Sequence, residues 1–280
     1  MRQPLLELQH VEISYFGKPV VHDLSLQIEP GEILGIVGES GSGKSTVIRG
    51  AMGLLGNRGT VTKGDIYYKG QNVTEAGEKE LRKIRGPEMG MVFQNPGASL
   101  SPIRTIEKQL YETVLEHEKT STRDIRERAL KIFETMGLPD GEGILKSYPF
   151  QLSGGMNQRV AIMMAMVQNP RLLFADEPTS ALDVTIQAQV VKEMMKMREI
   201  YGTAIAIVTH NIGLVEYMAD KVAVMYKGRL VEYGTKEEVI RHPREDYTKK
   251  LIGAVLRLNR GESHESTGGV KETEWKKSWK

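Results

Sequence analysis

Residues 38–46 read Gly-Glu-Ser-Gly-Ser-Gly-Lys-Ser-Thr, and a short apolar run at residues 32–37 leads directly into them. The spacing Gly38-x-x-x-x-Gly43-Lys44-Ser45 is the pattern of a phosphate-binding loop between a strand and a helix. Glycines let such a loop wrap closely around phosphate oxygens with its N–H groups pointing inward. The helix that follows adds its positive end to the same anion. The sequence therefore predicts a nucleotide site here.

Each polar group of this loop has an expected role. Lys44 is expected to neutralise the β- and γ-phosphates, and the Ser45 hydroxyl to bind Mg²⁺. The guanine-reading Asn-Lys-x-Asp pattern is absent from the sequence, which favours ATP over GTP. The complete expected phosphate-binding set is Gly38, Glu39, Ser40, Gly41, Ser42, Gly43, Lys44, Ser45 and Thr46.

The segments around the loop predict an α/β fold. Continuous apolar runs are typical of parallel strands that are covered on both faces. Besides residues 32–37, such runs occupy residues 89–93, 172–175, 204–209 and 222–226. Helical patterns occupy residues 44–53, 186–200 and 212–219. Strands and helices that alternate in this way form a layered, mostly parallel sheet.

Two further regions depart from this alternation. Residues 5–15 and 20–28 carry alternating and β-branched side chains around a turn at Gly17, which predicts an antiparallel N-terminal β subdomain. Residues 106–168 are rich in helix formers and show no convincing strand. We interpret them as a helical subdomain inserted between two parallel strands. Residues 229–233 are expected to form the last strand.

Composition limits the classes of function. Among 280 residues, the net charge is only +2, which argues against nucleic acid as a partner. The chain has no cysteine, so disulfides and thiolate metal sites are excluded. No apolar run approaches the roughly 20 residues that span a bilayer, and the N-terminus does not resemble a signal peptide. We expect any membrane role to be exerted through a partner.

Two carboxylates follow the apolar run at residues 172–175. Because ligands of open α/β sheets bind at the carboxyl ends of strands, Asp176 and Glu177 are expected at the nucleotide site. Asp176 would hold Mg²⁺ through water, and Glu177 would act as general base on the attacking water. An isolated Asp-Glu pair usually marks a solvated loop, but its position downstream of a phosphate-binding loop favours the catalytic interpretation.

Three more side chains are candidates by position. His210 and Gln94 each follow a predicted parallel strand. We expect His210 to contact the γ-phosphate or the attacking water, and Gln94 to reach Mg²⁺ or that water. Tyr15 lies near the end of an N-terminal strand, where it could stack on adenine or simply pack within the hairpin.

These motifs together resemble the nucleotide-binding subunit of an ABC transporter. Besides the residues above, the chain contains Leu152-Ser153-Gly154-Gly155 and Ser180-Ala-Leu-Asp183, in the order found in that family. The resemblance covers residues 5–240 and implies a P-loop NTPase core, with an extension at residues 241–260. Residues 261–280 are polar and aperiodic, which predicts a disordered tail.

The resemblance implies how the subunit works. In this family, ATP is held between the phosphate loop of one subunit and the signature sequence of another, here Ser153, Gly154 and Gly155. Asp183 is expected to contact the facing subunit, and Tyr15 to stack on adenine. The implied partners are a second ABC ATPase subunit, two multi-span permease subunits and, indirectly, an extracytoplasmic substrate-binding protein. The implied location is peripheral, at the cytoplasmic face of the plasma membrane.

A narrower resemblance is to the branch that imports oligopeptides, dipeptides and nickel. It rests on the strings at residues 38–41, 93–102 and 152–159. A partial tail match, His242-Pro243 to Leu251, contains Tyr247. The branch implies that residues 96–102 line a groove for a permease helix. The alternative function is an accessory ATPase of a soluble complex, such as that of phosphonate metabolism. The sequence does not name the cargo.

Overall fold

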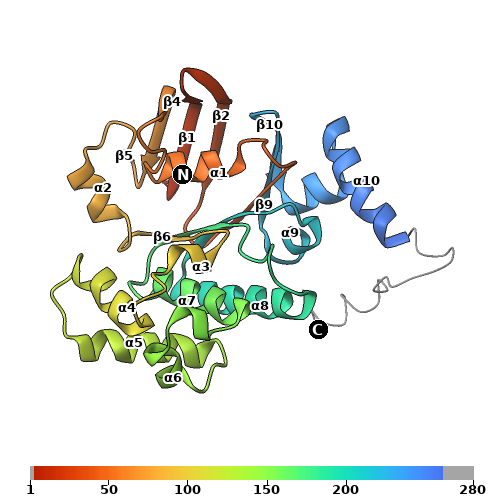
Figure 1. Cartoon of the computed structure of the whole chain (residues 1–280). Coiled ribbons are helices and arrows are strands. Elements are labelled where there is room, and N and C mark those ends of the chain that lie inside the picture. Colours follow the sequence, from red (N-terminus) through yellow and green to blue (C-terminus); the bar gives the residue numbers. More distant parts are fainter. Residues whose placement is uncertain (1–2, 261–280) are drawn as a thin grey trace.

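A six-stranded sheet forms the centre of the molecule in the computed structural model, which describes residues 3–260 (Figure 1). Its strands lie in the order β10-β9-β3-β8-β7-β6, and only the β9–β10 pair is antiparallel. The strands are β3 (Ile33–Val37), β6 (Met89–Val92), β7 (Leu172–Asp176), β8 (Ala204–Val208), β9 (Lys221–Tyr226) and β10 (Arg229–Thr235). Every residue of β3, β7 and β8 is buried, as expected for strands covered on both faces. The predicted mostly parallel α/β fold is confirmed.

A second, antiparallel sheet lies above the first in Figure 1. Its order is β2-β1-β4-β5, with bounds β1 (Leu6–Tyr15), β2 (Lys18–Ile28), β4 (Gly59–Tyr68) and β5 (Gln71–Asn72). The predicted hairpin of residues 5–15 and 20–28 forms β1 and β2. Strand β4 is not among the predicted strands, and its polar first half is largely exposed.

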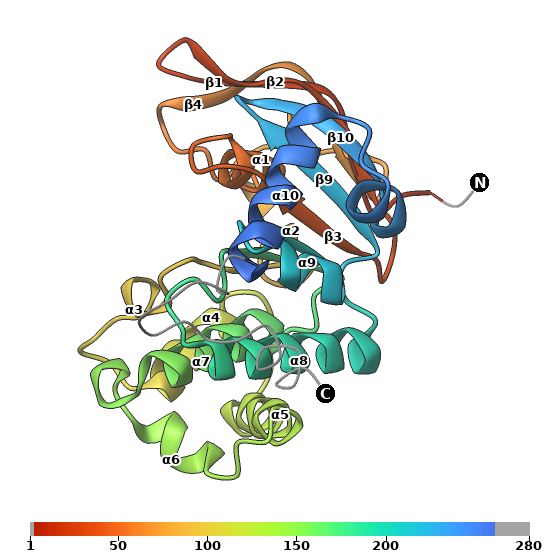
Figure 2. The ribbon, with the colours of Figure 1, turned by 90° about the vertical axis from the view of Figure 1, so that its right-hand side faces the viewer.

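Helices cover both faces of the central sheet. Helices α4 to α8 lie on one side of it, and α1 lies on the side of the antiparallel sheet (Figures 1 and 2). The α-helices from the N-terminus to residue 201 are α1 (Lys44–Ala51), α2 (Glu78–Ile84), α3 (Pro96–Ser99), α4 (Ile106–Leu115), α5 (Thr122–Thr135), α6 (Gly141–Lys146), α7 (Gly154–Met166) and α8 (Val184–Tyr201). Five of them, α3 to α7, lie between β6 and β7 in the chain.

The apolar core has two parts, one on each face of the central sheet. Alternate residues of β3 point to opposite parts of the core. Ile33 and Val37 pack in the part formed with α4 to α8, whereas Leu34 and Ile36 pack with α1 and the antiparallel sheet. Burial on both faces fixes the positions of the strand ends, because a shift of one residue would exchange the two sets of side chains. The loops at those ends are therefore firmly placed.

The C-terminal part of the described chain is helical. Helix α9 (Ile212–Met218) precedes β9, and a short η2 (Glu237–Arg241) leads to α10 (Asp246–Arg260). Helix α10 thus forms most of the extension predicted at residues 241–260. The tail predicted for residues 261–280 lies outside the described residues. Within residues 3–260, no helix is both long and apolar enough to cross a bilayer.

Candidate active site

The phosphate-loop sequence joins β3 to α1, and its lysine is held inside the loop. The Lys44 side chain is buried, and its Nζ donates to the carbonyl oxygens of Gly38 at 2.9 Å and Glu39 at 2.8 Å. Burial lowers the pKa of Lys44, while the nearby carboxylates of Glu177 and Asp176 act in the opposite direction. A cation is thus fixed within the loop and faces two acids.

The back of the loop rests on the turn between β9 and β10. Gly38 has a φ of +150°, and a Cβ there would lie 2.1 Å from the carbonyl oxygen of Met225. The N–H of Gly228 donates to the carbonyl oxygen of Ser42 at 3.1 Å. Glycine is therefore required at position 38 by close backbone approach as well as by conformation.

One buried polar atom of the loop has no partner within the described residues. The Oγ of Ser42 is inaccessible to solvent and makes no hydrogen bond there. An unpaired buried hydroxyl is costly unless a ligand satisfies it. A phosphate oxygen is such a ligand, so this observation fits the expectation that the loop binds phosphate.

Ser45 and Asp176 meet at the edge of the sheet. The Ser45 hydroxyl donates to Oδ1 of Asp176 at 2.7 Å. Asp176 is only 2% exposed, and burial raises its pKa, although the hydrogen bond from Ser45 and the charge of Arg49 oppose that effect. A hydroxyl and a carboxylate oxygen are ligands that Mg²⁺ prefers. This pair therefore fits the predicted magnesium site.

Glu177 lies at the centre of the remaining candidates. Its Oε2 accepts a hydrogen bond from Nε2 of Gln94 at 3.4 Å, and its Oε1 lies 3.3 Å from Nδ1 of His210. Its own N–H donates to Val208, the last residue of β8, at 2.8 Å. The backbone of Glu177 is left-handed, with φ of +45°. Gln94 and His210, which the sequence predicts at separate strand ends, thus both contact Glu177.

The strand order explains this convergence. The sequences that follow β3, β8, β7 and β6 contain, respectively, the loop at residues 38–46, His210, Glu177 and Gln94. These four strands are parallel neighbours in the sheet. Their carboxyl ends therefore bring the four elements to one edge, the usual ligand site of an open α/β sheet.

The signature residues open α7 in a different part of the molecule. Ser153 is the N-cap, and its hydroxyl accepts from the N–H of Met156 at 3.3 Å. Gly154 is exposed, and a Cβ there would meet nothing within 4 Å, whereas one on Gly155 would lie 2.9 Å from Cγ2 of Ile186. Figure 1 shows α7 among α4 to α8, whereas α1 lies across the central sheet. Ser153 and Gly154 therefore present an open helix N-terminus to the outside.

Asp183 and Tyr15 have simple structural surroundings. The Asp183 carboxylate caps α8, where it accepts from the N–H of Ile186 at 3.0 Å. Tyr15 is half-buried at the end of β1, and its ring lies against Gly59 of β4. The adjacent β2 packs on the phosphate loop, since a Cβ on Gly43 would lie 3.3 Å from the carbonyl oxygen of Val20. Tyr15 thus belongs to a hairpin that borders the loop.

Sequence reasoning missed one buried ion pair and one contact of the loop. Arg159 of α7 and Glu193 of α8 are almost fully buried, with Nη2 and Oε1 3.0 Å apart. Burial raises the pKa of Glu193 to about 7, although the guanidinium of Arg159 opposes the rise. Tyr247 of α10 contacts the loop at Glu39. No local pattern marks either contact, because each joins residues far apart in the chain.

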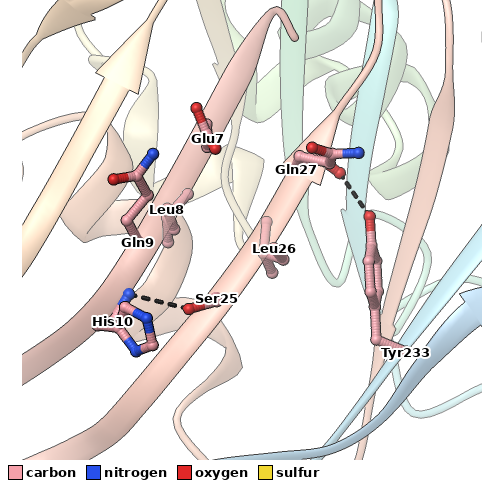
Figure 3. A pocket seen from close by; sticks show the side chains of 8 residues that line it. All are labelled: Glu7, Leu8, Gln9, His10, Ser25, Leu26, Gln27 and Tyr233. Atoms are coloured by element: carbon pink, nitrogen blue, oxygen red, sulfur yellow. Dashed lines mark hydrogen bonds between the residues drawn. The ribbon is translucent and has the colours of Figure 1, made fainter.

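A separate cavity lies outside this site. It has a volume of about 400 Å³ between β1, β2 and β10 (Figure 3). The Tyr233 hydroxyl at its margin donates to the carbonyl oxygen of Gln27 at 2.8 Å. None of the predicted site residues lines this cavity, so it is distinct from the candidate active site.

Comparisons with known sequences identify the family. The sequence profile of the family described as ABC transporter matches residues 21–180. The dipeptide transport ATP-binding protein DppD of Lactococcus lactis subsp. cremoris is 42% identical, with 90% of this chain and 74% of that protein covered. The oligopeptide transport ATP-binding protein OppD of Bacillus subtilis is 41% identical, with 94% and 75% covered.

Solved structures show the same fold. A dimeric ATP-binding cassette in a post-hydrolysis state, bound to ADP and Pi, has a TM-score of 0.72 and 28% identity; the match covers 82% of this chain and 98% of that one. The cbiO1 protein from Clostridium perfringens, part of the ABC transporter complex cbiONQ, has a TM-score of 0.76 and 28% identity, with 92% and 97% covered.

Proposed function

Because the chain belongs to the ABC transporter family and is an ATPase of that family, we propose that it powers the import of oligopeptides or dipeptides. The observation that supports ATP hydrolysis is that four predicted site elements lie at one edge of the central sheet. The loop at residues 38–46, Glu177, His210 and Gln94 occupy the carboxyl ends of four adjacent parallel strands. The proximity of this loop to the Glu177 carboxylate supports ATP hydrolysis at this edge.

ATP would bind with its phosphates in the loop. The Lys44 ammonium, held by two backbone carbonyl groups, supports a position facing the β- and γ-phosphates. Mg²⁺ would be held by Ser45 and by Asp176, directly or through water, and when bound it supplies positive charge to the phosphate oxygens. Gln94 is a further candidate ligand, since its side chain reaches the same group of acids.

Glu177 would accept the proton of the attacking water. It is the carboxylate at the centre of the cluster, and only a small part of its side chain is exposed. His210, with Nδ1 3.3 Å from Glu177 Oε1, is placed to orient the same water or to contact the γ-phosphate. The division of roles follows from chemistry, because an ionised carboxylate is a proton acceptor and an imidazole N–H is a donor.

A second ATPase subunit would complete the site. The N-terminus of α7, with Ser153, Gly154 and Gly155, offers N–H groups and a positive helix end to an anion. It lies in the helical region and not beside the loop of the same chain (Figure 1). Each loop would then receive the α7 terminus of its partner, with Asp183 near the contact and Tyr15 stacked on adenine. The dimeric cassette among the similar structures supports this proposal.

The permease subunits would bind a groove beside α3. A cavity of about 290 Å³ there is lined mainly by apolar residues of β6, of α7 and of the segment that follows α1, and by the end of α3, including Phe93, Ser99 and Leu100. Phe93, one of the lining residues, is exposed, so the cavity presents an apolar side chain to a partner. The resemblance to peptide-uptake subunits supports a permease helix as the occupant. Attachment through permeases would place the chain at the cytoplasmic face of the plasma membrane, with a substrate-binding protein acting from the other side.

Peptide uptake by a deletion strain tests this function. A strain without the chain should lose uptake of labelled di- or oligopeptides, and the wild-type chain should restore it. The Glu177→Gln variant, produced at the same level, should not restore it. Undiminished peptide uptake in the deletion strain, together with copurification of the chain with a soluble enzyme complex, would instead favour the accessory ATPase alternative.

A further inference from the structure

The start of α10 is anchored to the central sheet. The carboxylate of Glu232 on β10 accepts hydrogen bonds from the N–H groups of Arg244 at 2.8 Å and Glu245 at 3.3 Å. Two residues further on, the Tyr247 ring packs on Tyr226 at the end of β9, with ring centroids 4.2 Å apart. Figures 1 and 2 both show α10 beside β9 and β10. Tyr247 is therefore held in a defined place.

The hydroxyl of Tyr247 contacts the phosphate loop. The N–H of Glu39 donates to the Tyr247 hydroxyl oxygen at 3.2 Å, although the residues are 208 positions apart. This N–H belongs to the peptide group that also contains the carbonyl of Gly38. That carbonyl oxygen accepts the hydrogen bond from Lys44 Nζ. Because the C=O and N–H of a trans peptide point in opposite directions, Tyr247 and Lys44 hold opposite sides of one peptide plane.

The position of Lys44 depends on this plane. The Lys44 side chain is only 5% exposed, so its ammonium relies on protein carbonyl groups in place of water. One of its two carbonyl partners is the oxygen of the plane that Tyr247 holds, and the other is Glu39, the next residue. Rotation of the Gly38–Glu39 peptide plane would move the carbonyl oxygen of Gly38 directly and would disturb that of Glu39, the next residue.

We infer that Tyr247 is a positioning residue for nucleotide binding, through which the C-terminal extension orients the Gly38–Glu39 peptide and with it Lys44. The inference rests on the proposed binding of ATP phosphates by the loop at residues 38–46. The Tyr247 side chain itself need not touch the nucleotide. It keeps the loop in its binding geometry before ATP arrives, and such preorganisation increases affinity.

The test is Tyr247→Phe in the full-length chain, which keeps the ring on Tyr226 and removes only the hydroxyl. The matched control is Tyr233→Phe, which also removes a hydroxyl bound to a backbone group but lies away from the loop. The probe is the non-hydrolysable ATP analogue AMP-PNP with Mg²⁺. We expect its Kd, and the KM for ATP, to rise about threefold to tenfold in Tyr247→Phe, the range for one net hydrogen bond. The kcat should change by less than about twofold.

A second readout separates positioning from general stability. The Glu39 amide should exchange its hydrogen faster in Tyr247→Phe than in the wild type, whereas Tyr233→Phe should leave both this rate and the Kd unchanged. An unchanged Kd in Tyr247→Phe, or an equal rise in Tyr233→Phe, would overturn the inference. The Lys44→Ala variant tests the underlying assignment separately: if it binds AMP-PNP as tightly as the wild type, the phosphate-loop proposal itself fails.

Discussion

Ser45 and Asp176 are 131 residues apart in the chain, yet the hydroxyl of one donates to the carboxylate of the other at 2.7 Å. This bond joins the first turn of α1 to the end of β7. It brings together the two oxygen groups that sequence reasoning assigned separately to Mg²⁺. We therefore expect Mg²⁺ binding to require Ser45 and Asp176 together, as one hydrogen-bonded unit.

Ser45→Ala is expected to damage this unit. The change removes one oxygen and leaves the buried Asp176 carboxylate without its partner, which costs about 1–3 kcal/mol. We expect kcat to fall about tenfold or more and the Mg²⁺ concentration for half-maximal ATPase activity to rise. Magnesium titrations of steady-state activity measure both effects. Ser45→Thr, which keeps the hydroxyl, should recover most of the activity, and Ser25→Ala, at an exposed position of β2, should behave as wild type. An unaltered magnesium dependence in Ser45→Ala would contradict the assignment.

Glu177→Gln is expected to separate binding from hydrolysis. The amide keeps the shape of the side chain but cannot accept the proton of water, and loss of general-base catalysis costs about 10²–10⁴ in rate. We expect kcat to fall by that factor while the Kd for ATP stays close to that of the wild type. Phosphate release and equilibrium ATP binding measure the two quantities. Glu12→Gln, on β1, is the control, and ATP turnover by Glu177→Gln near the wild-type rate would rule out Glu177 as the base.

Adjacent glycines of the signature sequence should respond differently to alanine. At Gly154 a Cβ meets open space, so Gly154→Ala should keep the wild-type Tm. At Gly155 a Cβ would lie 2.9 Å from Ile186, which must shift; Gly155→Ala should lower the Tm. If the α7 terminus contacts the nucleotide of a partner chain, Gly154→Ala should nonetheless reduce ATP-dependent dimerisation. Thermal melts and light scattering with ATP test this pair, and normal dimerisation by Gly154→Ala would argue against the proposed interface.

The buried Arg159–Glu193 pair should make stability depend on pH. Burial raises the Glu193 pKa from 4.5 to about 7, so the folded state binds this proton more tightly than the unfolded state. Its contribution to stability is complete below about pH 4.5 and is lost as the pH rises through about 7. The stability of the wild type relative to Glu193→Gln should therefore decline by about 1–3 kcal/mol across that window. Denaturant unfolding at a series of pH values measures it. A constant difference would mean that Glu193 stays charged throughout.

Local sequence patterns predicted those parts of the fold that depend on burial alone. The strands β3, β7 and β8 are continuous apolar runs, and each is buried along its whole length. The same runs located Glu177 and His210, because each residue lies just beyond the end of such a strand. Their convergence followed from the rule that parallel strands end at one edge.

Elements that depend on distant partners could not be predicted in this way. The strand β4 has a polar, mostly exposed first half, and it is stabilised by pairing with β1 over most of its length. The contact of Tyr247 with Glu39 depends on how α10 is anchored to β10, which no local pattern encodes. The Arg159–Glu193 pair likewise requires α7 and α8 to be adjacent before either charge has a partner.

The left-handed backbone of Glu177 lowers folding stability at a residue that the proposed ATP turnover requires. For a non-glycine residue such a conformation costs about 1–3 kcal/mol, and glycine would adopt it without that cost. Selection for a higher free energy of unfolding alone would thus favour glycine at this position, whereas selection for ATP turnover favours the carboxylate. The chain therefore loses some folding stability at the residue proposed as the catalytic base. Substitutions intended to raise the Tm should leave Glu177 unchanged.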